Sequence, residues 1–241
     1  MSGKYHPVVH RHSGGKFRQF LIPITEKSFA ECCDPVTVIL CDGDFPTHDI
    51  PLEILNKADK IVCCDGAASE LLSHGREPFA IVGDMDSLPY EIKEKYSDRV
   101  FVDTCRETND LTKAVNWCVE RKYNNLTILG ATGKREDHTL GNISLLADYS
   151  TSIKVKMFTD TGVFLPINES AVFKVSVGQQ ISIFSITPET SITTSGLKYN
   201  VVERQFKSWY QGTLNEAESG RFGIYFDKGH LIIFFRYEYQ K

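Results

Sequence analysis

Short apolar segments alternate with amphipathic ones between residues 36 and about 160. The clearest amphipathic segment predicts a helix over residues 110–121, with Thr108 or Asn109 as its N-cap. Its apolar residues recur at helical spacing: Leu111, Ala114, Val115, Cys118 and Val119. The apolar segments are typical of strands and cover residues 36–41, 60–64, 79–82, 100–102, 126–129 and 153–158. This alternation predicts an α/β fold with a mostly parallel, doubly wound sheet.

Beyond about residue 160 the helical pattern ends, and apolar segments are separated by turn residues. We expect strands over residues 172–177, 181–186, 196–202, 222–226 and 231–237. The pattern predicts a C-terminal all-β, sandwich-like domain. Residues 161–165 could finish the first sheet or begin the second. We therefore expect an α/β domain over 36–160, a β domain over 161–241 and an N-terminal extension over 1–35.

The N-terminal extension has irregularly spaced histidines, which are more typical of a flexible tail than of a metal site. Residues 16–25 are apolar enough to form an added edge strand, and the pattern does not decide this point.

Charge and cysteine content narrow the function classes. The 241 residues include 27 Lys and Arg and 31 Asp and Glu, for a net charge of −4, which argues against a polybasic surface for nucleic acid or anionic lipid. No apolar run is long enough to cross a bilayer, and residues 1–15 lack the apolar core of a signal peptide, so we expect a cytoplasmic protein. The seven cysteines, an odd number, indicate reduced thiols in the core.

Carboxylates and glycines follow most of the predicted strands. Ligands bind beyond the carboxyl ends of the strands in an open α/β sheet, so these residues should share one site. They lie in Asp42-Gly43-Asp44, Asp65-Gly66-Ala67, Gly83-Asp84-Met85-Asp86-Ser87 and residues 130–138, with Asp110 at the start of the clearest helix. In an extended segment, Asp84 and Asp86 would point to the same side and repel each other unless a cation such as Mg²⁺ lay between them. A single strand-end Asp often only caps a helix, but several at one edge favour a metal site.

Residues 130–142 have features of a phosphate-binding loop without matching the common Walker motif. Gly133-Lys134 is followed by Arg135, and Ile128 stands where that motif requires its first glycine. Glycine N–H groups beside Lys134 and Arg135 could still bind a polyphosphate.

Taken together, the motifs resemble those of the thiamine pyrophosphokinase family. The resemblance covers residues 36 to 235 in the family's order. It rests on Asp65-Gly66-Ala67, on the G-D-x-D-S segment from Gly83 to Ser87, and on residues 108–113, 130–138, 194–200 and 212–216.

The resemblance implies a homodimer with active sites between subunits, in which thiamine receives the terminal diphosphate of ATP, with Mg²⁺ as cofactor. It implies an ATP-binding catalytic domain over 36–160 and a thiamine-binding domain over 161–241. The implied metal ligands are Asp84, Asp86 and Asp110, with Lys113, Arg135 and Asp137 around the transferred phosphates. The implied ATP-binding residues are Gly43, Asp65, Gly66, Ala67, Thr132 and Gly133, and the implied thiamine-binding residues are Ser195, Tyr199 and Asn215. Which Asp acts as general base stays open.

Two residues depart from the family pattern. Tyr199 stands where tryptophan is common, and Leu214 stands where serine is common. Tyr199 could stack on the cationic vitamin or could be a half-buried packing residue of a strand.

Two other functions stay open at this point. Asp42-Gly43-Asp44 also fits a phosphatase of haloacid-dehalogenase type, although Pro46 departs from that pattern. The third possibility is a non-catalytic nucleotide-binding sensor.

Overall fold

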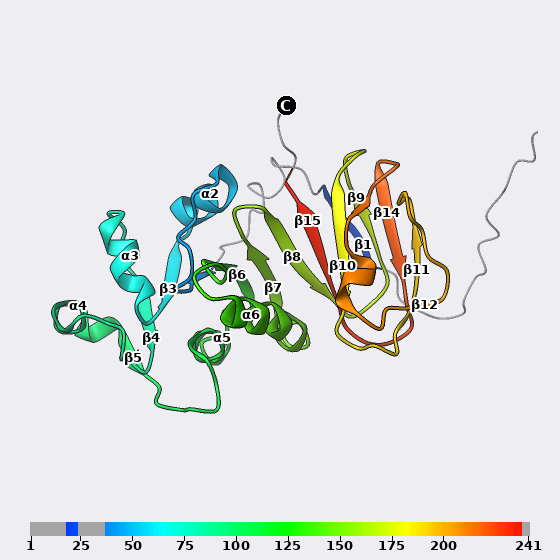
Figure 1. The fold of residues 1–241 in the computed structure, drawn as a ribbon. Helices are drawn as coiled ribbons and strands as arrows, with labels where there is room; N and C mark the ends of the chain where they lie inside the picture. Colours follow the sequence, from blue (N-terminus) through cyan, green and yellow to red (C-terminus); the bar gives the residue numbers. More distant parts are fainter. Residues whose placement is uncertain (1–17, 24–36, 238–241) are drawn as a thin grey trace, which may run out of the picture.

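A ten-stranded sheet and a five-stranded sheet form the framework of the protein (Figure 1). The computed structural model describes residues 18–23 and 37–237. Within that part, no helix is long and apolar enough to span a membrane.

One half of the ten-stranded sheet is parallel, in the order β7-β6-β2-β3-β4-β5. Its strands are β2 (Thr37–Leu40), β3 (Lys60–Cys64), β4 (Ala80–Gly83), β5 (Val100–Val102), β6 (Asn125–Leu129) and β7 (Lys154–Phe158). All six strands were expected from the apolar segments, to within one residue at each end. The prediction of a mostly parallel sheet is confirmed.

Helices cover both faces of this sheet, as Figure 1 shows. Val38 and Leu40 of β2 join a core cluster with residues of α2 and α3, whereas Ile39 joins a second cluster with residues of α5 and α6. Successive strand residues point to opposite faces, so α2 and α3 lie on one face and α5 and α6 on the other. The helices are α2 (Asp49–Lys57), α3 (Ala67–Ser73), α4 (Tyr90–Lys95), α5 (Asp110–Glu120) and α6 (Glu136–Tyr149), with short 3₁₀ turns η1 (Ser97–Arg99) and η2 (Trp209–Gly212).

Helix α5 forms as its apolar spacing predicts. The side chain of Asn109 accepts a hydrogen bond from the Thr112 N–H at 2.9 Å and caps the helix. This cap fixes the first turn of α5, which carries Asp110 into the site described below.

The second half of the ten-stranded sheet is antiparallel and continues directly from the first. Strand β8 (Gly162–Ile167) pairs with β7 on one side and with β15 (Leu231–Arg236) on the other. Residues 162–165 therefore continue the first sheet, whose antiparallel half begins with them. The sheet ends with β10 (Gln180–Ser185) and β13 (Asn215–Glu216).

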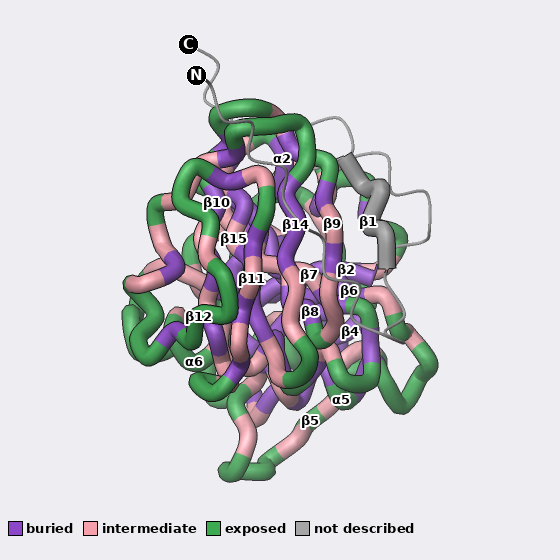
Figure 2. Tube along the Cα trace, turned by 90° about the vertical axis from the view of Figure 1, so that its right-hand side faces the viewer, coloured by how far each residue is buried: buried purple, intermediate pink, exposed green. Residues whose placement is uncertain are grey.

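The five-stranded sheet packs on this antiparallel half. It runs β1-β9-β14-β11-β12, from β1 (Arg18–Pro23) through β9 (Ala171–Lys174), β14 (Arg221–Tyr225) and β11 (Ser191–Ser195) to β12 (Arg204–Gln205). The ring of Phe173 lies 5.6 Å from that of Phe222 and 5.2 Å from that of Phe235 on β15, and all three are buried. Figure 2 views the sandwich from this side, with buried stretches along β9, β14 and β10. The expected sandwich-like β region is confirmed, while the boundary at 160/161 stays a prediction.

Strand β1 answers the question left open for the N-terminal extension. It forms an edge strand that pairs in parallel with β9. The rest of residues 1–35 lies outside the described part, as do Cys32 and Cys33. The described cysteines are free thiols, and Cys41, Cys63, Cys64 and Cys118 are buried.

The predicted strand over residues 196–202 is wrong. Gly196 has a φ of +80°, and an added Cβ would lie 2.0 Å from the Arg221 carbonyl oxygen, so β11 ends just before it and the chain turns. The actual strand, β11, was missed because Ser191–Ser195 is rich in polar residues; alternate burial of Ile192 and Thr194 marks it as a strand. Strand β9 also ends at Lys174, earlier than the apolar pattern predicts.

Candidate active site

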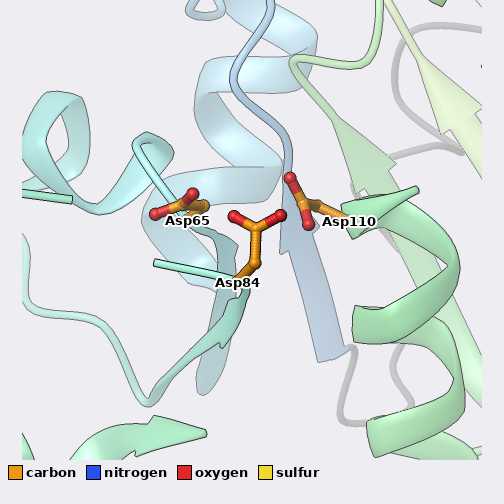
Figure 3. Close-up of side chains that lie close together, drawn as sticks. All are labelled: Asp65, Asp84 and Asp110. Atoms are coloured by element: carbon orange, nitrogen blue, oxygen red, sulfur yellow. The ribbon is translucent and has the colours of Figure 1, made fainter. Parts of the chain in front are cut away.

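Three carboxylates meet at the carboxyl edge of the parallel strands. Asp65 follows β3, Asp84 follows β4, and Asp110 begins α5. One oxygen from each lies within 4.8 Å of the others (Figure 3). We call Asp65, Asp84 and Asp110 the acidic cluster. Like charges at this distance repel, and a cation between them would relieve this repulsion.

Strand pairing and one glycine bring the acidic cluster together. The Asp65 N–H donates to the Val82 carbonyl oxygen at 3.1 Å, which extends the pairing of β3 with β4 beyond the strand ends. At Gly83, an added Cβ would lie 3.0 Å from Asp65 Cβ and 3.4 Å from Asp110 Oδ1. Glycine therefore provides the space in which the Asp65 and Asp110 side chains approach each other.

Lys113 supplies one positive charge to the acidic cluster. Its Nζ lies 2.9 Å from Asp110 Oδ1 and 3.5 Å from Asp84 Oδ2, and the residue is only 4% exposed. Burial lowers the pKa of Lys113, but the hydrogen bond to Asp110 and the charges of Asp110 and Asp84 outweigh it and leave the pKa raised. One charged lysine does not balance three carboxylates, so the cluster retains negative charge that favours a further cation.

Asp65 is the buried member of the cluster. Its residue is 3% exposed, and its Oδ2 accepts a hydrogen bond from the Ser87 N–H at 3.1 Å. Its Oδ1 is buried and has no hydrogen-bond partner among the described residues. Burial, together with the charges of Asp110, Asp84 and Asp86, raises its pKa against the opposing effect of the Ser87 N–H. A metal ion at Oδ1 would satisfy this oxygen.

Asp84 and Asp86 do not lie on one extended segment. Strand β4 ends at Gly83, and Met85 has a φ of +68°, so the chain turns between the two carboxylates. The Asp86 N–H donates to Asp84 Oδ1 at 3.2 Å, and this bond, aided by Lys113, holds the pKa of Asp84 below its ordinary value. Asp86 itself is exposed and lies outside the acidic cluster. The expectation of an extended segment from Asp84 to Asp86 is therefore wrong, and Asp86 as a metal ligand stays a prediction.

Two loops, residues 42–44 and residues 130–134, contact each other beside the acidic cluster. The Gly43 N–H donates to the Gly130 carbonyl oxygen at 2.7 Å, and the Asp44 N–H donates to the Thr132 carbonyl oxygen at 2.8 Å. An added Cβ at Gly43 would lie 2.4 Å from both carbonyl oxygens, and one at Gly133 would overlap the Asp44 carboxylate. We call residues 130–134 the glycine loop; its position depends on residues 42–44.

Further contacts connect the glycine loop to the other predicted ATP-binding residues. Asn142 donates to the Ala131 carbonyl oxygen at 2.9 Å, and Asn109, the N-cap of α5, donates to Asn142 at 3.0 Å. An added Cβ at Gly66 would lie 3.0 Å from Asp42 Oδ2. Gly43, Asp65, Gly66, Ala67, Thr132 and Gly133 thus lie along one edge of the sheet. Asn142 ends the stretch with features of a phosphate-binding loop, but its two contacts were not predicted, because they depend on how α6 packs against α5 and the glycine loop.

Arg135 and Asp137 pair with each other at the start of α6. Arg135 donates through Nε at 3.1 Å and through Nη2 at 2.5 Å to the Asp137 carboxylate, and both residues are exposed. Arg135 lowers the pKa of Asp137 to about 2. Within the described residues, no hydrogen bond or ion pair connects this couple to the acidic cluster.

The predicted thiamine-binding residues lie in the β region. The Tyr199 N–H donates to Asn215 Oδ1 at 3.1 Å, and Asn215 Nδ2 donates to the Tyr199 carbonyl oxygen at 2.8 Å. Tyr199 lies in a turn and is 64% exposed, so the alternative of a half-buried strand residue is wrong. Ser195 ends β11 and is exposed. No hydrogen bond among the described residues connects these side chains to the acidic cluster.

These features define a class: an α/β protein with an acidic site at the carboxyl edge of its parallel strands, joined to a β-sandwich region. Sequence comparison narrows the class to a family. Residues 52–157 match the thiamin pyrophosphokinase catalytic domain, and residues 162–234 match the thiamin pyrophosphokinase substrate-binding domain. The chain belongs to the thiamin pyrophosphokinase family.

Individual relatives agree with this assignment. Thiamin pyrophosphokinase 1 of Caenorhabditis elegans is 31% identical over 162 residues, which cover 61% of this chain and 66% of that protein. Thiamine pyrophosphokinase 1 of Oryza sativa subsp. japonica is 30% identical over 170 residues, which cover 58% of this chain and 64% of that protein. The matched part therefore spans slightly less than two thirds of these relatives.

Solved structures show the same fold. Thiamin pyrophosphokinase from Candida albicans superposes with a TM-score of 0.73 at 16% identity, over 90% of this chain and 94% of that one. Thiamine pyrophosphokinase from Bacillus subtilis superposes with a TM-score of 0.70 at 22% identity, over 85% of this chain and 100% of that one.

Proposed function

We propose that this protein transfers the terminal diphosphate of ATP to the hydroxyl group of thiamine, which produces thiamine diphosphate and AMP. The observation that carries the proposal is the acidic cluster around buried Lys113, beside the glycine loop, in a chain of this family. Diphosphoryl transfer depends mainly on positioning and on neutralising phosphate charge, and these residue types supply both.

Mg²⁺ is the proposed cofactor, and the acidic cluster fits it. Asp65, Asp84 and Asp110 offer hard oxygen ligands, and the unpartnered Oδ1 of Asp65 is a ligand atom without another role. When bound, the ion would neutralise charge on the phosphate oxygens. Asp86, which is exposed and lies two residues after Asp84, is proposed as a further ligand or as a partner of a bound water.

The chain's own residues have separate tasks in this proposal. Lys113 holds the carboxylates of Asp84 and Asp110 in place through its ammonium group. Thr132 and Gly133 of the glycine loop, with Gly43 and Asp65-Gly66-Ala67, form the ATP site, where glycines let phosphates approach the backbone. Arg135, held by Asp137, is proposed to contact the transferred phosphates.

Ser195, Tyr199 and Asn215 are proposed to bind thiamine across a homodimer interface. Support for the vitamin site comes from the exposed ring of Tyr199 and from its two hydrogen bonds with Asn215, which fix the turn. Support for a dimer comes from other exposed apolar side chains in the same region, Val202, Tyr210 and Leu214. In this arrangement the β region of one subunit completes the site of the other.

Residues 36–160 are proposed to bind ATP, and residues 161–241 are proposed to bind thiamine. A cytoplasmic location is also proposed; the buried free thiols suit a reducing compartment.

The two other functions that the sequence left open are not supported. Asp42 pairs with Lys134 at 2.9 Å, and the Asp44 carboxylate packs on Gly133, so the D-x-D segment has a role in fixing the glycine loop.

One incubation tests the proposed function. The full chain is incubated with Mg²⁺ and ATP, with and without thiamine, and the products are separated by chromatography. We expect AMP and thiamine diphosphate in equal amounts, only with thiamine. Thiamine-independent release of inorganic phosphate would indicate a phosphatase, and nucleotide binding without turnover would indicate a sensor.

A further inference from the structure

Residues 41–48 connect β2 to α2, and their first half supports the glycine loop. Three of their N–H groups donate across to it or to the strand before it: Cys41 to the Leu129 carbonyl oxygen at 2.9 Å, Gly43 to Gly130 and Asp44 to Thr132. Gly43 is in close contact with two of these carbonyl oxygens. A shift of residues 41–48 would therefore move the glycine loop.

The second half of this segment is held by one carboxylate from a distant part of the chain. Asp160 accepts hydrogen bonds from the Thr47 N–H at 3.0 and 3.1 Å, from the His48 N–H at 3.2 Å, and from the Thr47 hydroxyl group. Hydrogen bonds to a charged acceptor are stronger than neutral ones. Asp160 thus fixes the chain at the entry to α2, where His48 is the N-cap.

The position of Asp160 is itself well defined. It lies in the tight turn between β7 and β8, where the Thr159 N–H donates to the Gly162 carbonyl oxygen at 2.9 Å. Residues 41–48 have a second contact near this turn, because the ring of His48 stacks on that of Tyr237 with the ring centres 4.6 Å apart. Tyr237 is in turn bound to the turn between β7 and β8, since its N–H donates to the Thr161 carbonyl oxygen at 3.0 Å. Asp160 falls between the two stretches that match the family's domains.

We infer that Asp160 is a positioning residue for ATP. By holding Thr47 and His48, it keeps residues 41–44 against the glycine loop, and so preserves the shape of the nucleotide site from a point outside that site. The inference rests on the proposed function, since it assigns ATP to the glycine loop.

The test compares the full-chain variant Asp160→Asn with wild type. The amide keeps the size of the side chain but loses the charge, and its NH₂ group cannot accept from the backbone donors. We expect the KM for ATP and the dissociation constant for Mg²⁺-ATP to rise by about fivefold or more, with the KM for thiamine unchanged. Amide exchange in residues 41–48 should become faster, as measured by mass spectrometry. Asp98→Asn, an exposed carboxylate in η1, is the matched control and should change neither quantity.

A second variant keeps the inference testable where Asp160→Asn does not fold. Thr47→Val removes only the hydroxyl group and leaves both backbone N–H groups bonded to Asp160. It should shift ATP binding in the same direction by a smaller factor, and unchanged binding in this variant would then overturn the inference.

Other results overturn the inference in distinguishable ways. A folded Asp160→Asn protein with normal ATP binding and normal amide exchange would overturn the positioning role of Asp160 and leave the proposed function intact. An equal rise of both KM values, with a lower melting temperature, would show that Asp160 only stabilises the fold. Wild-type protein that binds no Mg²⁺-ATP would overturn the proposed function as well.

Discussion

Lys113 Nζ lies 2.9 Å from Asp110 Oδ1, one turn earlier on the same helix, and both side chains point into the acidic cluster. Because α5 spaces the two residues by three positions, they lie on one face of the helix. The two residues are close in sequence, whereas the other members of the cluster, Asp65 and Asp84, follow two neighbouring strands.

Replacing Lys113 should destabilise the protein most when no metal is present. Lys113→Met keeps much of the side-chain volume but removes the only charge that offsets the cluster among the described contacts. We expect a loss of about 1–3 kcal/mol in the free energy of unfolding, below the range for fully buried pairs because both carboxylates are partly exposed. Millimolar Mg²⁺ should restore part of the lost free energy of unfolding. Thermal melts in EDTA and in Mg²⁺ measure this difference, and equal losses in both would contradict it.

Asp65→Asn should change stability and activity in opposite directions. Neutralising Asp65 removes repulsion within the cluster, so the metal-free protein should melt at a higher temperature. The same change removes a proposed Mg²⁺ ligand, so kcat/KM at limiting Mg²⁺ should fall by about 100-fold or more. Melting curves and steady-state rates test the two parts.

Asp84→Asn and Asp110→Asn should show the same large loss of activity, and Asp86→Asn tests the remaining predicted ligand. Near-normal activity in both Asp65→Asn and Asp84→Asn would show that the acidic cluster holds no metal.

The contact of Asp160 should make stability depend on acid pH. Although burial raises its pKa, the hydrogen bonds from Thr47 and His48, with the charge of His48, leave that pKa below 3.8. The ionised form is therefore favoured by folding, and its contribution is present above the unfolded pKa and lost as pH falls through the folded value. The difference in unfolding free energy between wild type and Asp160→Asn, from urea titrations, should shrink as pH falls below about 4. A pH-independent difference would point to a steric effect, for instance on the neighbouring ring of Tyr237.

Tyr199 should affect thiamine use without affecting stability. A cation–π contact contributes about 0.5–2 kcal/mol, so Tyr199→Ala should raise the KM for thiamine about twofold to thirtyfold and leave that for ATP unchanged. Because the residue is 64% exposed, the melting temperature should hardly move. Tyr199→Trp should preserve or improve thiamine use through its larger ring. An unchanged thiamine KM in Tyr199→Ala would exclude the stacking role.

A dimer should be the active species. Light scattering at micromolar concentration should show twice the mass of the 27.2 kDa chain. If the vitamin site spans two subunits, dilution below the dimer dissociation constant should reduce specific activity. A fully active monomer would contradict the shared site.

The elements that depend on local pattern could be predicted from the amino-acid sequence. The parallel strands and α5 form where apolar spacing places them, since a buried strand or an amphipathic helix needs that spacing along its own length. The glycine and aspartate motifs also indicated the correct edge of the sheet, because residues after parallel strands share that edge.

Which carboxylates meet could not be predicted in this way, because it depends on the folded chain. The spacing of Asp84 and Asp86 favoured that pair, but the left-handed turn at Met85 separates them, and strand pairing brings Asp65 in instead. The bond between Asp160 and Thr47 joins residues 113 positions apart. The turn at Gly196 likewise depends on close contact with Arg221. Such contacts depend on which strands pair and on how the loops beyond their ends pack, and both are properties of the whole chain rather than of any local segment.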